Sequence, residues 1–104
     1  MKIRILVMNG QRLVQIEHGT EWTTERMETA NGVKPGIYNI HSAATVDKTK
    51  SHSGPVIFTD KEHIYQKVSN TLVKHRIEDF EKLPEIGDNT IVKYKDIKAV
   101  VAKS

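Results

Sequence analysis

The chain has 104 residues and a formal net charge of +3, with 16 basic and 13 acidic side chains and no cysteine. This length predicts one domain with a modest core, and the lack of cysteine excludes disulfides and thiolate chemistry. The opening apolar run is too short and interrupted for a signal peptide, and no run is long enough to span a membrane. We therefore expect a soluble cytoplasmic protein without membrane contacts.

The first half is predicted to form β-hairpins. Asn9-Gly10 is the favoured pair for a two-residue type I′ turn, because both central residues need positive φ. This turn pairs Met8 with Gln11, and the alternation then predicts a core face with Ile3, Ile5, Val7, Val14 and Ile16. We expect further strands over Glu21–Ala30 and Gly36–Ile40, so that residues 1–46 form an N-terminal region of two β-hairpins. A polar connector over Ser42–Ser53 is expected to be flexible.

The second half, residues 47–104, is predicted to form a small curved β-barrel of the SH3-like or OB-like kind. Ile77, Phe80 and Leu83 have helical spacing before Pro84, which predicts one short helix over Glu78–Leu83. The fold class is therefore mainly β, and we expect both halves to form one compact unit. The strands are expected over Gly54–Thr59, His63–Val68, Thr71–Ile77, Thr90–Lys95 and Lys98–Ala102.

The central hairpin of the second half carries polar residues on both faces. A turn at Ser69-Asn70 pairs Gln66 with Val73, and its aliphatic residues indicate that Gln66 and His75 share the inward face. These two side chains are close enough to interact as diagonal neighbours. The favoured interpretation is a buried pair that satisfies its own hydrogen bonds. The alternative is a polar pocket at the barrel mouth that receives a ligand or a partner's backbone.

The opposite face of this hairpin is predicted to be a basic surface with an aromatic ring in its middle. A positive groove with a stacking ring is typical of proteins that bind single-stranded nucleic acid. However, exposed strands often carry lysine simply to prevent edge pairing, and nearby acidic residues would dilute the field. An ordinary solvated face therefore stays open as the alternative. The residues of this candidate binding face are His63, Tyr65, Lys67, Lys74 and Arg76.

Patterns for catalysis or metal binding are weak. The histidines have no zinc-binding spacing, and no glycine-rich phosphate loop occurs. Ser51-His52-Ser53 could be paired with Asp47 or Asp60 as a nucleophile system, but it lies in the segment expected to be least rigid. We therefore expect no catalytic residues, no metal, no cofactor and no small-molecule substrate. Trp22 and Tyr38 are expected in the core, with anchoring of a protein partner as the alternative.

The order of short motifs in the second half resembles the KfrB-like domain of plasmid and conjugative-element proteins. The resemblance covers roughly Lys50 to Val101. One difference lies in the last turn, where Asp96-Ile97 replaces the expected Asp-Gly. Because isoleucine rarely adopts positive φ, we expect a longer turn or another turn type. The motifs are Ser53-Gly54-Pro55-Val56, Ile64-Tyr65-Gln66, Val73-Lys74-His75, Phe80 to Pro84, Gly87, and Ile91-Val92-Lys93-Tyr94.

The resemblance implies an accessory of a mobile element, without known catalytic residues, and favours a binding module over an enzyme. The first hypothesis is accordingly a non-enzymatic assembly protein that binds a protein partner in plasmid maintenance or transfer. It predicts an exposed apolar patch or an open sheet edge. The alternative is nucleic-acid binding through the Tyr65 face, with affinity that falls steeply with salt.

Overall fold

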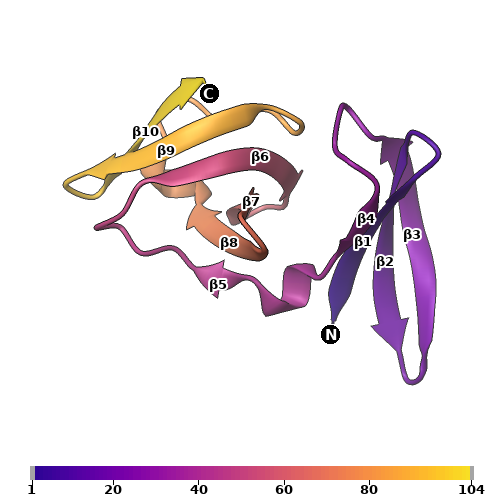
Figure 1. The fold of residues 1–104 in the computed structure, drawn as a ribbon. Coiled ribbons are helices and arrows are strands. Elements are labelled where there is room, and N and C mark those ends of the chain that lie inside the picture. Colours follow the sequence, from indigo (N-terminus) through magenta and orange to yellow (C-terminus); the bar gives the residue numbers. More distant parts are fainter. Residues whose placement is uncertain (1, 104) are drawn as a thin grey trace.

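Each strand expected from the sequence is present, with small shifts at the ends, in the computed structural model, which describes residues 2–103 (Figure 1). Within that range the chain forms β-strands and two short 3-10 turns, η1 (Ile40–Ser42) and η2 (Ile77–Asp79). The first sheet has the order β3-β2-β1-β4, with β1 (Ile3–Met8), β2 (Gln11–His18), β3 (Glu21–Thr29) and β4 (Gly36–Tyr38). The second has the order β10-β9-β6-β7-β8-β5, with β5 (Ala44–Thr45), β6 (His52–Thr59), β7 (His63–Val68), β8 (Thr71–Arg76), β9 (Asn89–Lys95) and β10 (Lys98–Lys103).

The first hairpin has the predicted turn and register. Asn9 and Gly10 have φ values of 53° and 74°, as a type I′ turn requires, and Met8 pairs with Gln11. The register also sets Arg12 opposite Val7 on the core face, where Arg12 is only 2% exposed. Its Nε donates to the carbonyl of Thr29 at 2.9 Å. The core face of this hairpin therefore contains a buried guanidinium that the aliphatic pattern alone does not predict.

The second sheet curves because β6 pairs with different strands along its length. Its first part, His52–Pro55, pairs with β9, and its second part, from Val56 to Thr59, pairs with β7, with a register shift between Val56 and Phe58. At Gly54 a Cβ atom would lie 1.8 Å from the carbonyl oxygen of Lys67, so glycine permits this close approach of two backbones.

The second sheet is open over the residues that the structure describes. Its outer strands β10 and β5 do not pair with each other. The mainly β class is therefore confirmed, whereas a closed SH3-like or OB-like barrel is not found.

Two local predictions in the second half need correction. The helix expected over Glu78–Leu83 is replaced by the single turn η2, because the chain becomes extended at Phe80 and forms a bridge with Ala99. The connector Ser42–Ser53 is partly ordered by β5, which pairs in parallel with β8.

The last hairpin adopts one of the two alternatives expected for its unusual turn. Lys95 pairs directly with Lys98, so the turn still has two residues. Asp96 alone takes a positive φ, of 58°, and Ile97 does not. The turn is thus of another type rather than longer, since isoleucine occupies the position that tolerates a side chain.

The two sheets share an apolar core that lies between them. Ile5, Val7 and Val14 of the first sheet belong to one cluster with Phe58 and Tyr65 of the second. Figure 1 shows the curved second sheet beside the flatter first one. One face of the second sheet is therefore covered by the first sheet, and its other face curls around a separate interior.

No helix in residues 2–103 is long and apolar enough to cross a membrane.

Candidate functional site

The interior of the curled second sheet contains a hydrogen-bonded polar network. Gln66 and His75 are fully buried, and Gln66 Oε1 lies 2.8 Å from His75 Nε2. Gln66 Nε2 donates to the carbonyls of His52, Gly54 and Thr90 at 3.1–3.2 Å. These carbonyls belong to β6 and β9, so one side chain of β7 ties three strands together. Such buried networks stabilise a fold when every member has a partner.

The network determines the protonation state of His75. Because Gln66 Nε2 faces three carbonyls, Gln66 Oε1 must accept, and His75 Nε2 must carry the proton. His75 Nδ1 then accepts from the Tyr94 hydroxyl at 2.7 Å. Burial, with a smaller contribution from nearby His52, lowers the pKa of His75 to about 4. Burial also raises the pKa of Tyr94 to about 12, so both groups are neutral at physiological pH.

Tyr65 lies in the core between the sheets, although the sequence pattern places it on an exposed basic face. It is 7% exposed, its ring centroid is 5.9 Å from that of Phe58, and its hydroxyl donates to Asp60 Oδ2 at 2.8 Å. Burial and the Asp60 carboxylate raise the pKa of Tyr65. The strand alternation is as predicted, but the first sheet covers this face. The ring is therefore not available for stacking on a base.

Three residues of the predicted basic face do come together, in a groove that we call the basic groove. His63 pairs with Arg76 across β7 and β8, and Lys74 follows on the same face. Lys48 and Lys61 also line the groove, together with the acidic Glu62 and Glu78, and its volume is about 680 Å³. Arg76 pairs with Glu78 and Lys48 Nζ lies 3.0 Å from Asp79, but Lys61 and Lys74 have no carboxylate partner among the described residues. The groove can therefore attract an anion.

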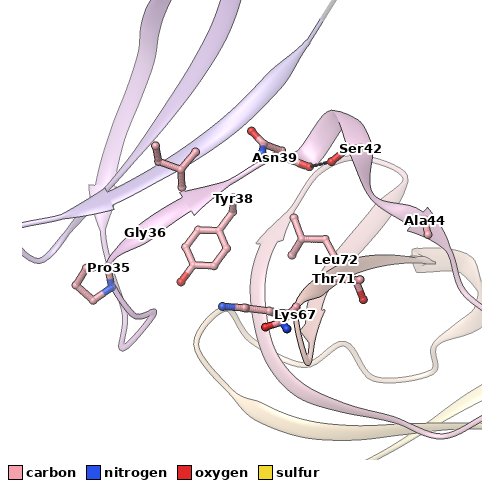
Figure 2. Close-up of a pocket in the computed structure, with 11 residues that line it drawn as sticks. Pro35, Gly36, Tyr38, Asn39, Ser42, Ala44, Lys67, Thr71 and Leu72 are labelled. Atoms are coloured by element: carbon pink, nitrogen blue, oxygen red, sulfur yellow. Dashed lines mark hydrogen bonds between the residues drawn. The ribbon is translucent and has the colours of Figure 1, made fainter.

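The remaining predicted residue, Lys67, lines a different hollow, which we call the strand-edge groove. It lies between β4, η1 and the β7–β8 hairpin and has a volume of about 410 Å³. Figure 2 shows Tyr38 of β4 and Lys67 of β7 pointing toward each other across it. Lys67 Nζ is 5.5 Å from the centroid of the Tyr38 ring, and the Tyr38 hydroxyl donates to the carbonyl of Lys34 at 2.6 Å. Tyr38 thus has its expected core position and also forms one wall of this groove.

Several residues of these sites are not among those the sequence singles out. Tyr94 occurs only within a family motif, and because it lies 19 residues from His75 no local sequence pattern signals their contact. Lys61 could be found from its place next to β7, whereas Lys48 reaches the basic groove only through the parallel pairing of β5. Over residues 2–103 no three His, Asp or Glu side chains are grouped so that they could hold a metal ion.

Comparisons with known proteins give two matches. The family described as "KfrB Domain" matches residues 51–103. "Protein TraB" of Escherichia coli is 33% identical over 95 residues, which cover 88% of this chain and 65% of TraB. The chain thus spans slightly less than two thirds of the length of this relative. Because the match is longer than the 51–103 segment, it includes part of the first sheet as well.

Proposed function

This chain belongs to the KfrB domain family, and on that basis we propose that it is a non-enzymatic accessory protein of a plasmid or conjugative element that binds a protein partner. The family resemblance supports the mobile-element setting. The observation that carries the binding role is the free edge of β4 beside the strand-edge groove. An exposed sheet edge can accept an additional strand from another protein through main-chain hydrogen bonds.

The buried polar network supports a structural role for the most unusual polar residues of the chain. Gln66 and His75 direct their polar atoms at one another, at Tyr94 and at backbone carbonyls, and both are fully buried. A general acid or base must reach a substrate directly or through one water molecule. The most strongly perturbed histidine is therefore used within the fold, which agrees with a protein that binds rather than catalyses.

The proposal is tested by crosslinking in two kinds of cell. One carries the plasmid that encodes the protein, and the other lacks this plasmid but expresses the tagged protein. The tagged protein is crosslinked, purified under denaturing conditions and analysed by mass spectrometry. We expect one or a few plasmid-encoded proteins to be enriched, with nuclease treatment leaving the enrichment unchanged. Enrichment that disappears after nuclease treatment, or the absence of any enriched protein, would contradict a direct protein partner.

The basic groove supports nucleic-acid binding as a second candidate function. Of the cations that line this groove, Lys61 and Lys74 have no carboxylate partner among residues 2–103, and such charges bind phosphates with strong salt dependence. The test is fluorescence anisotropy with labelled single- and double-stranded DNA at low and physiological salt. Binding that weakens with salt and is lost in the Lys61→Glu/Lys74→Glu variant supports this function. Equal binding by a Lys95→Glu/Lys98→Glu control and by the groove variant would refute it.

A further inference from the structure

The strand-edge groove has an uneven charge that identifies the chemistry of its occupant. Among residues 2–103, Lys67 is the one charged residue that lines it, and no acidic side chain does. Lys67 is half-buried and has no carboxylate partner among the described residues, and its Nζ lies beside the Tyr38 ring. A cation beside an aromatic ring still favours a negative charge, because the ring does not neutralise it. The groove is therefore complementary to a carboxylate.

The walls of the groove indicate the form in which this carboxylate arrives. One wall is the unpaired edge of β4, a strand of three residues at the end of the first sheet. The opposite wall is the end of the β7–β8 hairpin, where Asn70 and Thr71 are exposed. An extended segment placed between them can pair with β4 over about 10 Å, at roughly 3.3 Å per residue. Such a segment presents alternate side chains toward Lys67.

The apolar surface beside the edge fits the same occupant. Ile37 in the middle of β4 is 58% exposed, so its side chain offers apolar surface to a strand that pairs with β4. Leu72 lies on the hairpin side of the groove, as Figure 2 shows. A peptide with apolar residues around one acidic residue would cover Ile37 and place its carboxylate near Lys67. Edge pairing would supply affinity and the Lys67 contact would supply specificity.

We propose that the strand-edge groove binds an extended segment of the protein partner as an additional strand on β4, and that Lys67 selects an Asp or Glu side chain in this segment. This inference rests on the proposed function, because it assumes a protein partner. It adds the location of the contact, the conformation of the bound segment and its charge.

The test is selection of a random-peptide display library on the purified full chain and on two variants. Wild type is expected to enrich peptides with an acidic residue at one fixed position between apolar residues. Lys67→Glu should bind these peptides about tenfold more weakly or worse and should enrich Lys or Arg at that position. Lys95→Glu, with the same charge change on the distant β9, should select the wild-type sequences. Circular dichroism establishes that each variant is folded.

A second measurement locates the bound peptide. Nuclear magnetic resonance of the labelled protein with the best selected peptide should shift the backbone amides of Gly36–Tyr38 and the amide of Lys67. The proposal is overturned if no peptide is enriched, if the selected peptides lack an acidic position, if Lys67→Glu selects the same peptides, or if the shifts lie elsewhere. Crosslinking of a plasmid-encoded protein by Lys67→Glu at the wild-type level would overturn this inference and leave the proposed function standing. If the wild type crosslinks to no plasmid-encoded protein, both this inference and the proposed function are overturned.

Discussion

The buried His75 should make the stability of this protein sensitive to mild acid. Burial lowers its pKa from the ordinary value of 6.5 to about 4 in the folded protein. Between these two values the unfolded chain binds a proton that the folded chain does not. The free energy of unfolding is therefore highest above about pH 6.5, decreases as the pH falls through this window, and levels off with respect to His75 below about pH 4.

The size of the effect follows from the difference between the two pKa values. A gap of about 2.5 units corresponds to at most about 3 kcal/mol, and about 2 kcal/mol of this is lost at pH 5. A small domain has only about 5–15 kcal/mol of stability, so this loss is readily measured. The neutral state is required because His75 Nδ1 accepts from Tyr94, and a protonated ring could no longer do so.

Urea unfolding at pH 7 and pH 5 measures this difference directly. The wild type should lose about 2 kcal/mol between the two conditions, and the His75→Gln variant should lose correspondingly less. The comparison depends on the change with pH, so a general destabilisation of the variant does not affect it. If His75→Gln retained the full acid sensitivity, or if the His75 ring titrated in the folded protein near pH 6.5, the reasoning would be refuted.

Two further substitutions test the packing of the second sheet by urea or thermal unfolding. Tyr94→Phe leaves His75 Nδ1 buried without a donor and should cost about 1–3 kcal/mol; an unchanged unfolding midpoint would contradict the hydrogen bond between these two side chains. Gly54→Ala places a Cβ 1.8 Å from the Lys67 carbonyl and should cost more than about 3 kcal/mol, because two backbones must separate. Gly19→Ala is the control, with a positive φ but open space around it, and should cost only about 1–2 kcal/mol; equal costs for both variants would show that steric contact is not the cause.

The register of the hairpins could be predicted because turns and alternation are local properties of the chain. Asn9-Gly10 sets the pairing of β1 and β2, and Ser69-Asn70 sets Ile64 opposite His75. The same register also indicates that Arg12 is buried, since the turn places it opposite the core residue Val7. That signal was missed because the core face was defined by aliphatic residues alone.

The exposure of Tyr65 could not be predicted from its own hairpin. Alternation shows that Tyr65 and Gln66 point to opposite faces, but both are buried, because one side faces the first sheet and the other faces the curled interior. Which face meets solvent depends on contacts between residues far apart in the chain. The grooves depend on such contacts too, since Lys67 meets Tyr38 only where the two sheets come together.

The shared core between the sheets has a consequence for the modularity of the family. The segment that carries the family match begins at residue 51, yet its Phe58 and Tyr65 are covered by Ile5, Val7 and Val14 from outside it. We therefore expect a KfrB domain that lacks this first sheet to need an equivalent cover from its own neighbouring sequence, or to expose an apolar face. We therefore expect the cooperative folding unit to extend beyond the segment that matches the family, so that a fragment beginning at residue 51 should unfold more easily than the full chain.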